Sequence, residues 1–160
     1  MSDIALAWNP AIGGFDLALE GGQLVTDDGL MTAIIVSLFT DARASADDVL
    51  PEPGSDRRGW WGDMLSPVAA WQMGSKLWLL AREKQVPAVL ARARDASRAA
   101  LGWLIEDGIA SSVEVSARFP RQGWLGLVIE IVRPNGPARQ KYDFAWNATD
   151  RELKVASYEL

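Results

Sequence analysis

The sequence predicts an α+β fold: an N-terminal β-hairpin, three main helices, and a C-terminal antiparallel meander of three to four strands. Three observations predict this order. Apolar residues recur at helical spacing between about 27 and 107, apolar and polar residues alternate between about 112 and 158, and glycine or proline–glycine runs separate these segments. We therefore expect one domain over 1–160, a length that can enclose its own core.

The N-terminal hairpin is indicated by a glycine pair. Residues 3–8 and 15–26 have the composition of short strands, and Gly21-Gly22 interrupts the second run as a two-residue turn does. A residue at 26–28 then caps the first helix, which runs to about Thr40. Its apolar face repeats at four-residue steps: Leu30, Ile34, Leu38.

Two further helices are expected before the sheet. Gly74-Ser75 restarts the chain as a second helix over 76–84. Pro87 ends that helix and opens a third one over about 87–107, since proline is tolerated in the first turn of a helix. Gly108 is then the natural C-terminal stop.

The C-terminal third of the sequence changes to a period of two, which is typical of strands. Alternating apolar residues mark strands at about 113–119, 125–131 and 142–146, and residues 152–159 could add a fourth. The expected sheet has at least one open edge, and an open edge can accept a strand from another chain.

The composition excludes several function classes. The chain has no Cys and no His, so zinc sites of imidazole or thiolate and Ser-His or Cys-His catalytic pairs are impossible. A formal net charge of −5 argues against a broad nucleic-acid surface. No apolar run reaches the roughly 20 residues that span a bilayer, and the N-terminus lacks signal-peptide features. We expect no membrane partner and assembly in the cytoplasm.

The acidic residues do not form a convincing catalytic pair. Asp27/Asp28 and Asp47/Asp48 are adjacent in sequence, so their carboxylates point in different directions, and the first pair is better explained as a helix cap. The sequence therefore predicts a protein that is not an enzyme, with no catalytic residues, no cofactor and no metal.

Residues 41–65 are expected to form a long ordered loop, and such loops are usually functional. Within it lies the run Asp56-Arg57-Arg58-Gly59-Trp60-Trp61-Gly62-Asp63. Arginine offers planar donors for carboxylates or indoles, and Trp and Arg are enriched at the energetic centres of interfaces. Two interpretations remain open: an internal staple of Arg–Asp pairs under a Trp lid, or a protein interface. The candidate interface residues are Arg57, Arg58, Trp60, Trp61, Asp56 and Asp63.

Several runs together resemble the gene-46-type tail protein of Mu-like phages. Beside residues 56–63, they are 24–30 (Leu-Val-Thr-Asp-Asp-Gly-Leu), 37–41 (Ser-Leu-Phe-Thr-Asp), 47–51 (Asp-Asp-Val-Leu-Pro), 74–82 (Gly-Ser-Lys-Leu-Trp-Leu-Leu-Ala-Arg) and 100–108 (Ala-Leu-Gly-Trp-Leu-Ile-Glu-Asp-Gly). The resemblance extends from about residue 15 to 146.

That family is similar in role to the gene-25-type wedge component of contractile tails. The resemblance implies a structural baseplate wedge subunit of a phage tail or tail-like particle, present in several symmetric copies. It implies partners too: a baseplate J-type wedge protein, central hub or tube proteins, and sheath subunits. The mature location would be the tail baseplate, after assembly in the host cytoplasm. Two alternatives are a carboxylate-dependent cell-wall glycan hydrolase and a tail-assembly chaperone.

Overall fold

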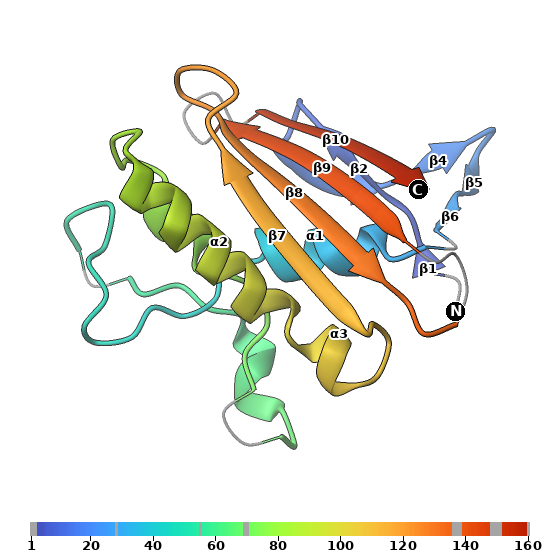
Figure 1. The fold of residues 1–160 in the computed structure, drawn as a ribbon, viewed down its shortest axis with the longest axis horizontal. Helices are drawn as coiled ribbons and strands as arrows, with labels where there is room; N and C mark the ends of the chain where they lie inside the picture. The colour runs from blue at the N-terminus through green and yellow to red at the C-terminus, as the bar shows by residue number, and fades with distance from the viewer. Residues whose placement is uncertain are drawn as a thin grey trace.

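A four-stranded antiparallel sheet dominates the fold and supports the core on one of its faces (Figure 1). The computed structural model describes residues 3–27, 29–54, 56–68, 71–135, 139–147 and 152–159, with side chains up to Val155 in the last range. The sheet has the order β10-β9-β8-β7, so consecutive strands are neighbours. Its strands are β7 (Ser112–Arg118), β8 (Leu125–Val132), β9 (Gln140–Asn147) and β10 (Glu152–Glu159).

The predicted meander is therefore confirmed, including its fourth strand. Its register explains the alternation in the sequence, because cross-strand partners share a face. Val115, Ile129 and Tyr142 form one inward row, and Ala117, Leu127 and Phe144 form the next. Ile129 and Phe144 are fully buried.

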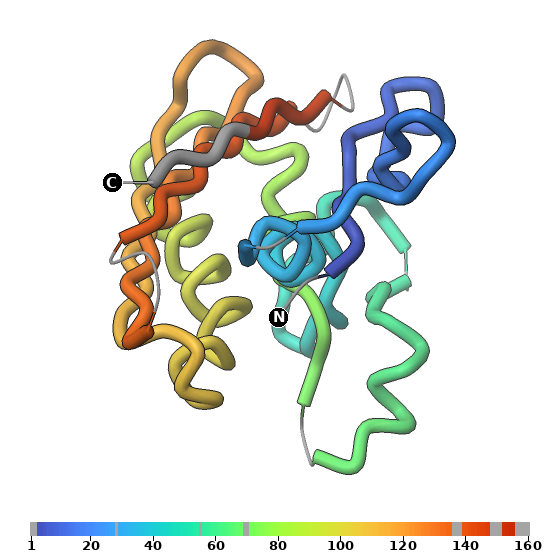
Figure 2. The backbone as a smooth tube through the Cα atoms, turned by 90° about the vertical axis from the view of Figure 1, so that its right-hand side faces the viewer, coloured from blue at the N-terminus to red at the C-terminus, as the bar shows by residue number. Residues whose placement is uncertain are grey.

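Two α-helices, α1 (Met31–Phe39) and α2 (Pro87–Leu101), cover the inward face of the sheet. Figure 2 shows the sheet in profile with both helices on the same side of it. Each helix buries one face: Ile34 and Leu38 in α1, and Ala93 and Leu101 in α2, have at most 1% of their surface exposed. Burial of such apolar side chains is the main favourable term in folding.

Six short strands in residues 3–27 form three small antiparallel pairs beside α1. They are β1 (Asp3–Ile4) with β6 (Thr26–Asp27), β2 (Leu6–Asn9) with β3 (Gly14–Leu17), and β4 (Leu19–Glu20) with β5 (Gln23–Leu24). The pair β4–β5 confirms the predicted hairpin. Its turn is Gly21-Gly22, and both glycines have positive φ, as such a turn requires.

Aromatic rings connect these hairpins to the sheet. Trp8 meets Phe15 edge to face at 5.4 Å, Phe15 meets Phe39 of α1 at 5.9 Å, and Phe39 meets Phe144 of β9 at 5.6 Å. Such offset and edge-to-face pairs add to the burial of the rings. The hairpins are thus part of the same hydrophobic cluster as the helices and strands.

Asp27 lies just before the first helix and bonds to its first turn, although the N-cap residue of α1 is Leu30 and not one of residues 26–28 as predicted. The Asp27 carboxylate accepts hydrogen bonds from the amides of Gly29 (2.9 Å) and Thr32 (2.8 Å), and the latter lies in the first turn of α1. Asp28 lies outside the described residues.

The prediction of three main helices is wrong. The predicted second helix, 76–84, is only a single 3-10 turn, η2 (Leu77–Leu80). All four of its apolar side chains are buried, so it has no solvent face of the kind that amphipathic spacing implies. Pro87 contributes as well, because the residue before proline avoids helical backbone, and Val86 is extended (φ −123°, ψ 154°).

The predicted third helix is confirmed only up to Leu101. After Gly102 the chain forms a separate single turn, α3 (Trp103–Glu106), that ends before Gly108. Gly108 has a φ of 68°, so it terminates the helical region as predicted. Within the described residues, no helix is both long and apolar enough to cross a membrane.

Candidate functional site

The chain departs from the end of α1 at Asp41 and returns beside that point at Ser75. We call the described residues between 41 and 74 the projecting segment. At its base the Ser75 amide donates to the Thr40 carbonyl (2.9 Å), and the Ala42 amide donates to the Ser75 carbonyl (3.0 Å). The Trp78 indole also donates to the Ala42 carbonyl at 2.8 Å. These bonds join the two ends of the segment and attach them to the buried turn η2. Its lower part extends away from the sheet in both views (Figures 1 and 2).

Arg57 holds the inner part of the segment together. Its guanidinium donates to the carbonyls of Ser45 and Ala46, the second at 3.2 Å. In return, the Ala44 amide donates to the Arg57 carbonyl at 2.9 Å. These hydrogen bonds hold the backbone at residues 44–46 against the backbone at residue 57, although neither stretch forms a β-strand.

Arg58 is bound from three directions. Its guanidinium forms an ion pair with Asp41 at 2.7 Å and lies 4.4 Å from the centre of the Trp78 ring, a favourable cation–π distance. Its amide donates to the Asp56 carboxylate at 2.8 Å, and its φ is 51°, an uncommon value for a residue with a side chain. Asp56 and Arg58 therefore make contacts within the molecule, of the kind that the staple interpretation expects.

Asp63 ties the far end of the segment to its returning chain. It lies in the 3-10 turn η1 (Trp61–Leu65), and its carboxylate accepts a hydrogen bond from the Met73 amide at 3.0 Å. Gly62 lies under the Trp60 ring, so closely that an added Cβ would be 2.6 Å from its Cζ2 atom. Glycine at this position lets the Trp60 ring fold back over η1.

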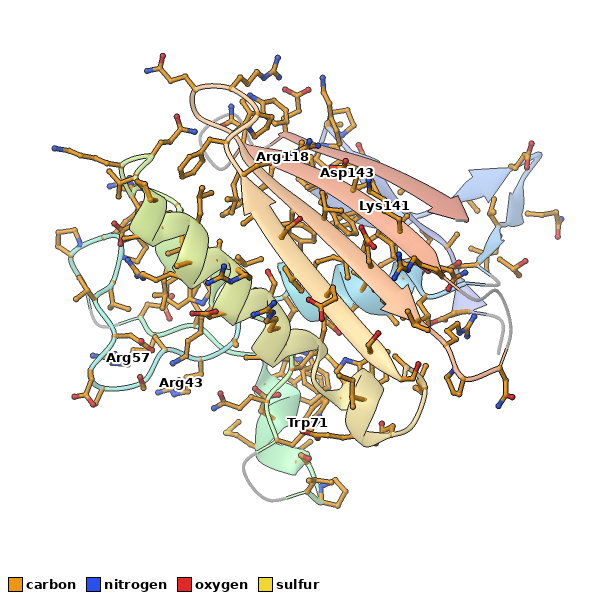
Figure 3. All side chains as sticks on the ribbon, viewed as in Figure 1. Arg43, Arg57, Trp71, Arg118, Lys141 and Asp143 are labelled. Atoms are coloured by element: carbon orange, nitrogen blue, oxygen red, sulfur yellow. The ribbon has the colours of Figure 1, made fainter. Side chains whose placement is uncertain are left out.

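The far end of the segment, around η1, carries large apolar side chains that are exposed to solvent. Trp61 is 68% exposed, Met64 84% and Leu65 74%. We call the exposed set the apolar ridge: Trp60, Trp61, Met64, Leu65, Val68 and Trp71. A hollow of about 430 Å³ runs along it. Figure 3 shows Trp71 at this lower end of the molecule.

The structure separates the six residues nominated from the sequence. Four of them, Asp56, Arg57, Arg58 and Asp63, make the internal contacts above, whereas the two tryptophans lie on the ridge. Sequence reasoning missed Met64, Leu65, Val68 and Trp71. The available signal was a set of large apolar residues without helical or strand periodicity inside a loop, which is unusual in a solvated segment.

A second polar cluster braces the inner part of the segment at Asp48. The Lys76 ammonium donates to its carboxylate at 2.6 Å, and the hydroxyl and amide of Ser45 both donate at 2.7 Å. These bonds, that from Lys76 above all, lower the pKa of Asp48 to about 2 from an ordinary value of 3.8. Hydrogen bonds to the charged form stabilise it relative to the protonated form.

This cluster predicts a loss of stability in acid. A folded-state pKa below the unfolded value means that the contribution is complete above pH 4 to 5 and is lost as the pH falls toward 2. Asp48→Asn should cost about 1–2 kcal/mol at neutral pH, allowing for partial screening by solvent. Urea unfolding between pH 6 and pH 2.5 should show that difference from wild type shrinking. Asp47→Asn, at the exposed neighbour, is the matched control, and a pH-independent difference would contradict the assignment.

The described residues contain no group of three acidic side chains placed to hold a metal ion.

Comparison with known proteins identifies relatives across most of the chain. Residues 30–138 match the family described as phage protein GP46. The baseplate protein gp46 of Escherichia phage Mu is 45% identical over 136 residues, covering 85% of this chain and 90% of that protein.

A second relative is the Mu-like prophage FluMu protein gp46 of Haemophilus influenzae. It is 43% identical over 141 residues, which cover 88% of this chain and 94% of the relative. The resemblance to gene-46-type proteins seen in the sequence is thereby confirmed. The chain belongs to the GP46 family of phage proteins.

Proposed function

We propose that this chain is a structural, non-enzymatic subunit of a phage tail baseplate, of the wedge type, and that it acts by docking to neighbouring tail proteins. Its family membership and the name of the Mu relative, a baseplate protein, support the baseplate role. The resemblance to gene-25-type wedge proteins supports the finer assignment. On that basis its neighbours are a baseplate J-type wedge protein, hub or tube proteins and sheath subunits, around several symmetric copies.

The observation that carries the docking role is the apolar ridge on a segment whose base is closed. Large exposed apolar side chains gain free energy when a partner removes them from water. Arg57, Arg58 and Asp63 hold the backbone that presents the ridge, so ordering it at the moment of docking costs little conformational entropy. The ridge thus combines apolar surface with preorganisation, and Trp is among the residues that most often dominate an interface.

The edges of the sheet offer a second place for a neighbour, and they are not equivalent. Arg98 of α2 lies 3.5 Å from Glu114 of β7. The Glu114 side chain lies on the face of the sheet opposite the helices, whereas Arg98 belongs to a helix on the inward face. The pair therefore crosses the outer edge of β7. Strand addition there would have to displace it. We therefore assign strand addition to the edge of β10.

Replacing Trp61 tests the docking role. Because Trp61 is 68% exposed, Trp61→Ala should leave the free energy of unfolding within about 0.5 kcal/mol of wild type. Loss of an interface anchor should lower incorporation into tails at least about tenfold. Mass spectrometry of purified particles measures the incorporation, and Val49→Ala, at an 82% exposed position of the same segment, is the control. Normal incorporation of the Trp61 variant would reject docking through the ridge.

The same particles test the alternatives. A tail-assembly chaperone would be missing from finished tails that contain every structural subunit. A carboxylate-dependent glycan hydrolase needs an acid whose pKa is raised and a second carboxylate about 5–10 Å away. The pKa of Asp48 is shifted in the opposite direction. Clearing of cell-wall substrate by the purified protein would favour the hydrolase instead.

A further inference from the structure

Two arginines of the projecting segment, Arg43 and Arg57, lack a carboxylate partner among the described residues, and Arg43 lies beside the apolar ridge. Among the residues that the structure describes, the Arg43 side chain donates to the Arg58 carbonyl alone, at 3.2 Å, and the Arg57 side chain to the carbonyls of Ser45 and Ala46 alone. No ion pair joins either of them to a described Asp or Glu, unlike Arg58, which pairs with Asp41. Figure 3 shows Arg43 and Arg57 on the side of the projecting segment that faces away from α2.

The unpaired charge of Arg43 adjoins the ridge directly. Arg43, Trp60, Trp61 and Met64 all line one hollow of about 460 Å³, which lies next to the hollow along the ridge. Asp63 also lines this hollow, and its carboxylate accepts a hydrogen bond from the Met73 amide but forms no ion pair with Arg43. The surface therefore combines exposed indole and thioether groups with guanidinium N–H donors that are only partly used.

A guanidinium bound to one carbonyl retains donors in a planar arrangement that matches a carboxylate. Charge-assisted pairs of this kind are stronger than neutral hydrogen bonds when they are shielded from water. A partner that covers Trp61 and Met64 would also remove water from around Arg43. Burying this cation unpaired would be costly, so the covering surface has to supply a negative group.

We infer that the apolar ridge docks into an apolar pocket bordered by carboxylates on a different protein chain of the tail. This inference rests on the proposed function and names the chemistry of the partner. A symmetric ridge-to-ridge contact between two copies of this chain would instead place like-charged arginines opposite each other. Like charges at such a contact oppose association. The ridge is therefore assigned to a contact with a different protein chain and not to a two-fold contact between copies of this one.

A pair of cross-linking variants in intact tails tests this inference. The first carries a benzophenone amino acid at Met64, which is 84% exposed, and the control carries it at Val49, which is 82% exposed. Irradiation should join position 64 to one other tail chain, and position 49 should give at least about tenfold less of that product. The second is Arg43→Lys, which keeps the charge and adds an amine that carbodiimide can couple to a carboxylate.

Carbodiimide should join the lysine at position 43 to an Asp or Glu of that same chain, whereas wild-type arginine should give no such product. Arg43→Glu should lower incorporation into tails at least about tenfold, with Arg43→Lys close to wild type. Cross-links only between copies of this chain, or the absence of any carboxylate adduct in tails that contain the variants, would overturn the inference. Absence of the wild-type chain from finished tails would instead reject the proposed function on which it rests.

Discussion

Gly74→Ala should destabilise the protein by on the order of 3 kcal/mol and loosen the base of the projecting segment. Gly74 has a φ of 96°, a conformation that residues with a Cβ rarely adopt. An added Cβ would lie 2.7 Å from the carbonyl carbon of Thr40 and 3.1 Å from the amide of Ala42. Both atoms belong to the backbone that pairs with Ser75, so the clash cannot be relieved by a side-chain rotation.

Urea unfolding measures the loss of stability, and hydrogen exchange at the Ala42 and Ser75 amides reports opening of the base. Gly21→Ala is the matched control. Its φ is also positive, at 57°, but nothing lies within 4 Å of the added Cβ, so the cost should be about 1 kcal/mol. Equal losses in the two variants would show that backbone strain alone, and not the contact with Thr40, sets the effect.

Phe144→Ala should destabilise the protein by about 3–5 kcal/mol, a large share of the total stability of an ordinary domain. Phe144 is fully buried and contacts Phe39, the helix residue through which Phe15 and Trp8 of the hairpins are connected to the sheet. Removal of the ring leaves a cavity at the junction of the sheet, α1 and the hairpins. Calorimetry or urea unfolding checks the size of the loss.

Phe144→Leu separates the volume of this side chain from its aromatic contact. Leucine fills most of the space, so its cost should be near 1–1.5 kcal/mol. Ile12→Ala, at a position that is 60% exposed, should change stability by no more than about 0.5 kcal/mol. A loss below 1 kcal/mol for Phe144→Ala would mean that the hairpins and helices pack without depending on this ring.

The sheet could be predicted because each strand buries one face and so alternates in sequence. Strands β7 to β9 begin and end close to the predicted positions, and the Gly21-Gly22 hairpin follows from the positive φ that only glycine adopts easily. The second helix could not be predicted in the same way. Residues 77–80 are apolar and helix-compatible, but neighbours on several sides bury them, and local spacing does not record those neighbours.

The sequence indicated where the candidate site lies but not which contacts its residues make. The run 56–63 marked the projecting segment correctly as unusual, and the presence of two arginines and two tryptophans indicated contacts. It did not indicate which contacts, because Asp41, Trp78 and Met73 are distant from this run in the sequence. Trp60 is folded over Gly62 and Trp61 points into solvent, although the two are adjacent and chemically identical.

By itself, the sequence determined the α+β order, the sheet, the family resemblance and the absence of His and Cys chemistry, because these depend on local periodicity, on residue identity and on unusual runs. The tertiary structure decided how the segment 56–63 is divided. Asp56, Arg57, Arg58 and Asp63 make hydrogen bonds or an ion pair within the molecule, while the ridge and Arg43 are left exposed. The partners of Arg58, Asp41 and Trp78, are 17 and 20 residues away in the sequence, so no local pattern could assign them.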